Sequence, residues 1–246
     1  MEGWILQLET KGSDGHHLSI MFKTDDPHVF ERDGVYYLWS SELQNFDDES
    51  IYTDGQIVLN RVVGAAALQG GIHYPLTIEH VGHLHADGSI EPSGRGRFGM
   101  HVGLFVQGVS GTKLPPARAW LELARQPNQE NVQIALYHFA PPHDWVTLYR
   151  VFDIVCDDLG RDPGINDDAV FNRGQQYMIT KRWVDQDDVD RFKNGANNRF
   201  ISMYDARHAN NNQPRKGTTG MNLSEGVAFI EKVLGRWYTD KTGTTT

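Results

Sequence analysis

Cysteine is nearly absent from this 246-residue chain, and its single thiol, Cys156, has no second cysteine with which to form an internal disulfide. One cysteine in a chain of this length favours a reducing compartment. No stretch approaches about 18 consecutive apolar residues, and the N-terminal residues lack the basic and apolar regions of a signal peptide. These absences predict a cytoplasmic protein with no membrane span and no secretory leader.

A surplus of positive charge is also absent, because 32 Asp and Glu outnumber 23 Lys and Arg and the formal net charge is −9. The charge is uneven along the chain. Residues 1–110 carry 6 basic and 15 acidic side chains, whereas residues 191–241 carry 9 basic and 4 acidic ones. The protein as a whole repels a polyanion, so nucleic acid is expected to bind only through a local basic face. The loop at 191–217 is the one place predicted to offer such a face.

Alternation of apolar and polar residues in the first part of the chain predicts strands. The alternation occurs at residues 4–8 and 18–22, and apolar runs at 29–30 and 35–39 flank Asp33-Gly34. Asp-Gly between two apolar runs is typical of a hairpin turn, because glycine tolerates the positive φ that such turns require. We predict a meander of four short strands here. A helix at 48–67 and strands at 76–84 and 100–109 are expected to follow.

Apolar residues at steps of three and four predict helices in the second part. The predicted helices cover residues 145–159, 166–182 and 185–194, and a last helix begins after Asn222. Asp144 is the expected N-cap of the first helix, and Asn222 with Glu225 resembles a capping box. The predicted fold class is therefore α+β. A mainly antiparallel β part with one helix, at residues 1–110, precedes a mainly helical part at residues 111–246.

The loop at 191–217 is the leading candidate for a binding site, because it is rich in Arg, Asn and Gly and holds one acidic residue, Asp205. Its candidate ligand-binding residues are Asn197, Arg199, Arg207, His208 and Arg215. The planar guanidinium of arginine matches phosphate or carboxylate, and a histidine titrates near neutral pH. The structural alternative is that Arg207 pairs with carboxylates of residues 144–190 and fastens the loop across those helices.

Histidines in the first part form a second, metal-binding candidate. His83 and His85 are two residues apart on a predicted strand, so both project from one face, and His101 follows on the next predicted strand. The alternative is that these are solvated strand histidines. The neighbouring Gly94–Arg97 stretch lacks the context of a P-loop, and we expect a hairpin loop there.

Three further features are expected to be structural. Cys156 lies within the strongest predicted helix, which favours a buried thiol over a nucleophile. The tryptophans at 145, 183 and 237 are expected to anchor the core. Pairs such as Asp157-Asp158 do not match the spacing of a calcium loop, so we expect them at solvated helix ends.

The last hundred residues resemble a pattern found in bacterial proteins to which no activity is attached. The pattern comprises Trp145, Leu148-Tyr149-Arg150, Arg191-Phe192, Ala196-Asn197, Ala206-Arg207-His208, Met221, Glu225 and Trp237. This resemblance implies no function. A comparison with helical ribonucleases of the HEPN type meets a clear departure, because those enzymes separate Arg and His by four to six residues, and here Arg207 and His208 are adjacent.

The sequence thus predicts a non-catalytic cytoplasmic module that needs no cofactor. It is expected to bind a partner protein or an anionic ligand, such as a nucleotide, RNA or a phosphorylated molecule, through the Arg/His/Asn loop. A metal-independent ribonuclease that uses Arg207 and His208 is the enzymatic alternative. A metal-dependent hydrolase on His83, His85 and His101 is the second alternative.

Overall fold

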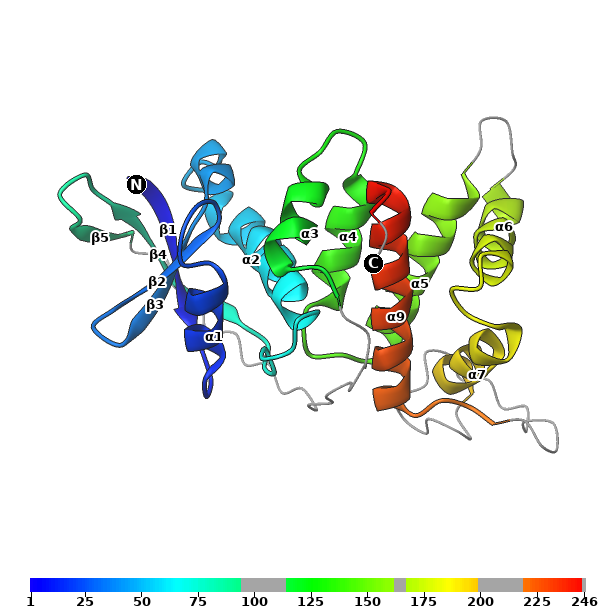
Figure 1. The fold of residues 1–246 in the computed structure, drawn as a ribbon. Helices are drawn as coiled ribbons and strands as arrows, with labels where there is room; N and C mark the ends of the chain where they lie inside the picture. The colour runs from blue at the N-terminus through cyan, green and yellow to red at the C-terminus, as the bar shows by residue number, and fades with distance from the viewer. Residues whose placement is uncertain (94–113, 162–166, 199–218, 245–246) are drawn as a thin grey trace. The chain divides into compact units, whose positions relative to one another are not determined.

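The structure is a computed structural model that describes residues 1–93, 114–161, 167–198 and 219–244 (Figure 1). The chain divides into two compact units. Unit 1 comprises residues 1–105, 116–123 and 140–142, and unit 2 comprises residues 106–115, 124–139 and 143–246. An antiparallel sheet lies in the N-terminal part and most helices belong to the C-terminal part, so the predicted α+β class is confirmed.

Unit 1 is built on a five-stranded antiparallel sheet with the order β2-β3-β1-β4-β5. Its strands are β1 (Gly3–Glu9), β2 (His28–Arg32), β3 (Val35–Trp39), β4 (Thr77–Leu84) and β5 (Ile90–Ser93). The helices are α1 (Asp14–Met21), the 3₁₀ helix η1 (Ser41–Asn45), α2 (Ile51–Ala67) and α3 (Ala117–Ala124), of which α3 ends one residue outside unit 1. The predicted strands at 4–8, 29–30, 35–39 and 76–84 and the helix at 48–67 are confirmed, and the predicted strand at 100–109 lies outside the described residues.

One face of the sheet packs against α2 and forms the core of unit 1. Leu6 of β1 is paired with Leu38 of β3 and Val81 of β4, and all three side chains are buried. Gly55 of α2 approaches this layer so closely that a Cβ there would lie 3.1 Å from a methyl carbon of Leu6. Removal of these apolar side chains from water stabilises the sheet and the helix together.

The predicted strand at residues 18–22 is wrong, because these residues belong mostly to α1. Leu18 and Phe22 are fully buried, but Ile20 between them is 61% exposed. The three side chains therefore do not lie on one buried face, as a strand would require. A spacing of four residues between Leu18 and Phe22 fits one side of a helix as well as one face of a strand. The spacing is therefore compatible with a strand and with a helix. Because α1 and α2 both lie within residues 1–110, the prediction of one helix in this part of the chain is also wrong.

A buried carboxylate fixes α1 in place. Asp14, in the first turn, is 1% exposed, and its Oδ2 accepts hydrogen bonds from the backbone N–H groups of His73 and Tyr74 at 2.9 and 2.8 Å. Gly15 beside it leaves room for the ring of Tyr36, which a Cβ would meet at 2.4 Å. These contacts come from residues far along the chain, so local alternation gave no information about them.

The β2–β3 hairpin confirms the predicted Asp-Gly turn. Arg32 and Val35 are paired, and Asp33 and Gly34 between them have φ values of 53° and 79°. The guanidinium of Arg32 donates a hydrogen bond to the carbonyl oxygen of Gly88, in the turn between β4 and β5. Because β2 and β5 are opposite edges of the sheet, this bond requires the sheet to curl toward the face that is not covered by α2.

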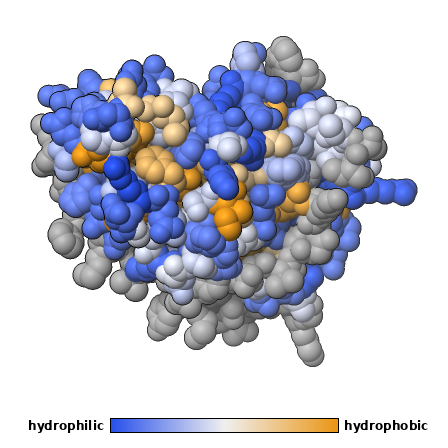
Figure 2. Space-filling model, turned by 60° about the vertical axis from the view of Figure 1, so that its left-hand side comes forward, coloured by the Kyte–Doolittle hydropathy of each residue, from blue (hydrophilic) through white to orange (hydrophobic). Residues whose placement is uncertain are grey.

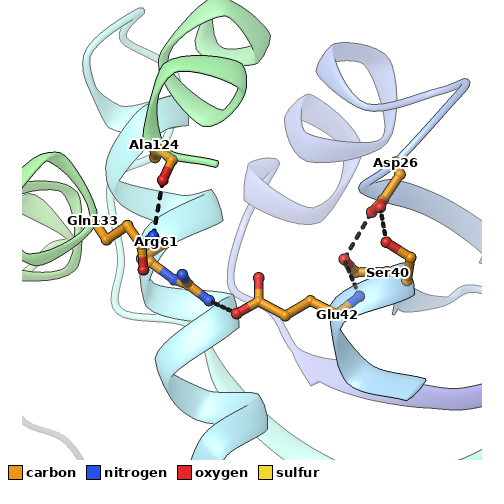
Figure 3. A network of polar contacts seen from close by, with 7 residues as sticks. Asp26, Ser40, Glu42, Arg61, Ala124 and Gln133 are labelled. Atoms are coloured by element: carbon orange, nitrogen blue, oxygen red, sulfur yellow. Dashed lines mark hydrogen bonds and ion pairs between the residues drawn. The ribbon is translucent and has the colours of Figure 1, made fainter. Parts of the chain in front are cut away.

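A chain of polar contacts ties the loops of unit 1 to α2 (Figure 3). Asp26, before β2, accepts a hydrogen bond of 2.7 Å from the Ser40 hydroxyl, and that hydroxyl accepts the backbone N–H of Glu42 at 3.3 Å. The Glu42 carboxylate pairs with the guanidinium of Arg61 in α2. The network therefore links residues on both sides of the β2–β3 hairpin to the helix beneath the sheet.

Unit 2 is helical. Its helices are α4 (Glu130–Phe139), α5 (Trp145–Gly160), α6 (Asp167–Thr180), α7 (Gln186–Asn197) and α9 (Leu223–Thr242). The predicted helices are confirmed, as are both expected starts. Asp144 forms a capping box with Thr147, and Asn222 forms one with Glu225. Each box satisfies backbone N–H groups that a helix start would otherwise leave unpaired.

Besides α1 and η1, two more helices were not predicted. The first, α3, has eight residues and directly follows Pro115-Pro116. The second, α4, buries Val132, Ala135, Leu136 and Phe139 on one side. That spacing of three and four residues is helical, so the information for α4 was present in the sequence. None of the helices in the described ranges is both long and apolar enough to cross a membrane.

The helices α5 and α6 touch backbone to backbone. A Cβ placed on Gly174 of α6 would lie 1.9 Å from the carbonyl oxygen of Cys156, and one on Gly160 of α5 would lie 1.9 Å from that of Val170. Only glycine permits this approach. The expected core positions of Trp145, Trp183 and Trp237 are confirmed, since these side chains are 2%, 7% and 0% exposed.

Asp158 connects three helices of unit 2. Its Oδ2 accepts hydrogen bonds from Trp237 Nε1 and Lys241 Nζ, both at 2.8 Å, and its Oδ1 accepts one from Asn131 Nδ2 at 3.0 Å. The prediction that Asp157 and Asp158 are both solvated is therefore wrong for Asp158, whose side chain is 17% exposed. Asp157, with a 43% exposed side chain, pairs with Arg161 one turn later as a surface residue.

Replacement of Gly174 by alanine is expected to destabilise unit 2, although alanine is the better helix former by about 1 kcal/mol. The added Cβ forces α5 and α6 apart, and overpacking of this kind costs about 1–3 kcal/mol. Thermal unfolding of Gly174→Ala measures the loss. Asn172→Ala, at an exposed position of the same helix, is the control and should unfold at or slightly above the wild-type temperature. An unchanged midpoint for Gly174→Ala would show that the backbones are not in contact.

Substitution of the two neighbouring aspartates should have very different effects. Asp158→Ala leaves three buried or half-buried donors without their acceptor, which we expect to cost about 2–4 kcal/mol of unfolding free energy. Asp157→Ala removes an exposed pair within one helix and should cost at most about 0.5 kcal/mol. Urea denaturation followed by circular dichroism compares the two variants, and equal losses would contradict the assignment of Asp158.

Candidate functional site

Of the five residues predicted to bind a ligand, one lies within the described part of the chain. Asn197 is the last residue of α7. Arg199, Arg207, His208 and Arg215 lie outside the described residues. The predicted loop boundary at residue 191 is wrong, because α7 continues to Asn197 and residues 191–197 are helical. The residues that join α7 to α9 are numbers 198–222, and we call 199–218 the joining segment.

Both ends of the joining segment are tied to each other. The backbone N–H of Met221 donates to the carbonyl oxygen of Arg191 at 3.0 Å. The Arg191 guanidinium pairs with Glu225, at the start of α9, at 3.0 Å, and lies 3.9 Å from Asp188 in its own helix. The charge of Arg191 is therefore used to hold α7 against α9, so this residue has a structural role.

Lys193 lies two residues further along α7 and has neutral surroundings. Its ammonium donates a hydrogen bond to the side-chain oxygen of Gln175 in α6, and it stands 5.1 Å from the centre of the Phe171 ring. Gln175 is only 7% exposed, so the amide is a fixed acceptor and not a mobile surface group. An ammonium has three donors, and the amide uses one of them. Lys193 thus retains positive charge and donors that no described carboxylate neutralises.

Asn197 follows Lys193 by four residues, so both side chains lie on the same side of α7. Its Oδ1 is buried and has no hydrogen-bond partner within the described residues. A buried polar atom without a partner costs free energy. The end of α7 therefore carries a cation and an unsatisfied amide, side by side, where the joining segment begins.

Many carboxylates of residues 144–190 already have partners in other parts of unit 2. Asp144 and Asp185 accept backbone N–H groups at helix starts. Asp158 and Asp188 pair with Lys241 and Lys232, and Asp190 accepts from Gln186. The structural alternative for the loop assumed that these acids await Arg207. Arg207 itself lies outside the described residues, so the structural alternative stays a prediction.

The histidines predicted to bind a metal contact different neighbours in the structure. The ring of His83, on the α2 side of the sheet, lies 3.7 Å from that of Trp4. His85 lies just beyond the end of β4, and its Nε2 is 3.2 Å from a carboxylate oxygen of Glu91. His101 lies outside the described residues. Within the residues that the structure places, no three His, Cys, Asp or Glu side chains gather as metal ligands.

Sequence reasoning did not single out Lys193 or Gln175. Lys193 was counted within the basic loop, but its position on a helix beside a buried amide was not foreseen. Gln175 is in a helix that the sequence predicted, and no spacing marks it as the partner of a residue 18 positions away. Their meeting depends on how α6 packs against α7, which is a tertiary property.

A comparison of the chain with protein-family models, with curated proteins and with solved structures gives no match.

Cys156 is confirmed as a buried thiol with no exposed surface. Burial raises its pKa far above the ordinary value, and the nearby Asp153 carboxylate adds to this increase. We expect the native protein to be unreactive toward Ellman's reagent at pH 8, because the thiolate is the reactive form. In concentrated urea one thiol per chain should react at once. Rapid reaction of the folded protein would contradict the placement of Cys156 in the core.

Proposed function

We propose that this protein is a non-catalytic binding module and that unit 2 takes an anionic ligand where α7 meets the joining segment. The ligand class is a phosphate-bearing molecule, such as a nucleotide or a short RNA. In this proposal Lys193 and the arginines of the segment meet the negative charge, and Asn197 supplies a hydrogen bond. The segment's contributing residues are Arg199, Arg207, His208 and Arg215.

The observation that carries the proposal is the difference between Lys193 and the cations around it. Arg191 and Lys232 face carboxylates, whereas Lys193 contacts an amide and an aromatic ring. A cation held by neutral groups keeps its charge available for a ligand.

Thermal melting with defined anions tests the proposal. The probes are ATP and a ten-nucleotide single-stranded RNA, and the variants are Lys193→Gln and Arg207→Ala/His208→Ala. A ligand that binds only the folded state raises the melting midpoint. We expect at least one probe to raise the wild-type midpoint, and both variants to bind that probe about tenfold more weakly, since a charge-assisted hydrogen bond contributes about 1.5–3 kcal/mol.

Arg236→Ala is the matched control, because Arg236 is an exposed cation on α9 away from the end of α7. It should respond to the probe like wild type. If neither probe moves the wild-type midpoint, or if Arg236→Ala loses as much affinity as Lys193→Gln, the proposed anion site is wrong. Cleavage of the RNA during incubation would replace the non-catalytic proposal with the ribonuclease alternative.

A further inference from the structure

The face of the sheet that α2 does not cover contains a cleft in unit 1. Gln7 in β1 is paired with Tyr37 in β3 and His80 in β4, and all three side chains emerge on this face. The cleft has a volume of about 510 Å³. Its lining includes Gln7, Arg32, Asp33, Tyr37, Ile90 and Pro92, and we call it the sheet cleft.

The curl of the sheet creates the sheet cleft. Arg32 and Asp33 approach from the β2–β3 hairpin, and Ile90 and Pro92 approach from β5 on the opposite edge. The hydrogen bond from Arg32 to Gly88 holds the two hairpins near each other. A volume of this size lies within the range of clefts that bind small molecules. Figure 2 brings the side of the molecule with these strands forward and shows apolar patches among hydrophilic residues.

Two opposite charges line the sheet cleft without neutralising each other. Arg32 uses one guanidinium N–H for the Gly88 carbonyl, which leaves further donors of its planar fork. Asp33 occupies the turn itself, with φ at 53°. Neither side chain forms an ion pair with any residue that the structure describes. A ligand that carries both charges has an oppositely charged group for each of these two exposed side chains.

The remaining wall of the sheet cleft combines aromatic and apolar side chains, among them Tyr37, Ile90 and Pro92, with the polar side chains of Gln7, His80 and Ser89. The Tyr37 ring stacks on that of Phe30, with centroids 5.5 Å apart and planes inclined by 22°, so its position is fixed from behind. Burial raises the pKa of Tyr37, Arg32 opposes this increase, and Asp33 and Glu79 add to it, so three charged side chains act at the tyrosine. Ile90 and Pro92 face it from β5.

We propose that the sheet cleft binds a free α-amino acid with an apolar side chain. The Arg32 guanidinium meets the carboxylate, Asp33 meets the ammonium, and the side chain lies against Tyr37 and Ile90. A polyanion is disfavoured here, because residues 1–110 carry 15 acidic and 6 basic groups. A zwitterion adds no net charge to this acidic part of the chain. The site lies within unit 1 and does not depend on the function proposed for unit 2.

Isothermal titration with three related probes tests the charge assignment. L-Phenylalanine carries both charges, N-acetyl-L-phenylalanine lacks the ammonium, and L-phenylalaninamide lacks the carboxylate. We expect L-phenylalanine to bind at least about tenfold more tightly than either analogue, since each analogue forfeits one charged contact. Failure of L-phenylalanine to bind at millimolar concentration would overturn the proposal, as would equal affinity for all three probes. Binding of uncharged adenosine in preference to L-phenylalanine would overturn it too.

Two variants assign each charge to its residue. Asp33→Asn keeps the turn, because Asn-Gly favours the same positive φ values as Asp-Gly. It should weaken L-phenylalanine about tenfold but leave N-acetyl-L-phenylalanine unchanged. Arg32→Gln should weaken L-phenylalanine more strongly than L-phenylalaninamide, because it removes the contact with the carboxylate in addition to the hydrogen bond that holds the two hairpins near each other.

Asp48→Asn is the control, since Asp48 is an exposed acid of unit 1 outside the sheet cleft and should bind like wild type. Wild-type melting midpoints for all three variants would show that the fold is kept. Wild-type affinity of Asp33→Asn or Arg32→Gln for L-phenylalanine would show that the charged residues do not contact the ligand, and would overturn the proposal.

Discussion

The candidate anion site depends on where the indole of Trp145 lies. A Cβ on Gly195 of α7 or on Gly226 of α9 would come within 2.7 Å of this ring, so the indole of α5 lies directly against both helix backbones. The carbonyl oxygen of Met221, just before α9, is also close to Gly195. One buried side chain thereby sets the positions of both ends of the joining segment.

The basic side chains of unit 2 differ in their partners. Some pair with carboxylates and hold helices together, whereas Lys193 contacts uncharged groups. Arg191 and Lys241 each face an aspartate or glutamate, and each such pair joins two helices. Lys193 belongs to the same region but contacts Gln175 and the Phe171 ring. Several acids of unit 2 are thus paired within the helices, and Lys193 is one of the described cations with which no carboxylate forms an ion pair. The number of basic residues in a stretch of sequence therefore does not give the number that can contact an anionic ligand, because some of them form ion pairs within the fold.

Unit 1 obtains its binding surface in a different way. An antiparallel sheet with one covered face would ordinarily present a nearly flat second face to water. Here Arg32 reaches the turn between β4 and β5, and the edges of the sheet approach each other. The same side chain bends the sheet and lines the resulting cleft. Because unit 1 is acidic and its cleft holds one arginine and one aspartate, the ligand proposed for it is a zwitterion, whereas the ligand proposed for the end of α7 is an anion.

The sequence by itself determined those features that depend on residues close together in the chain. The capping boxes at Asp144 and Asn222, the Asp33-Gly34 turn and the amphipathic helices of unit 2 all have short-range causes, and each was predictable. Only the tertiary structure decided that residues 14–21 form a helix, because the contact of Asp14 with His73 and Tyr74 spans about sixty residues. It likewise decided that the half-buried Asp158 connects three helices and that Lys193 meets Gln175. Hydrogen bonds and charge pairs of this kind leave no periodic pattern in the sequence, since their partners are brought together by packing and not by spacing.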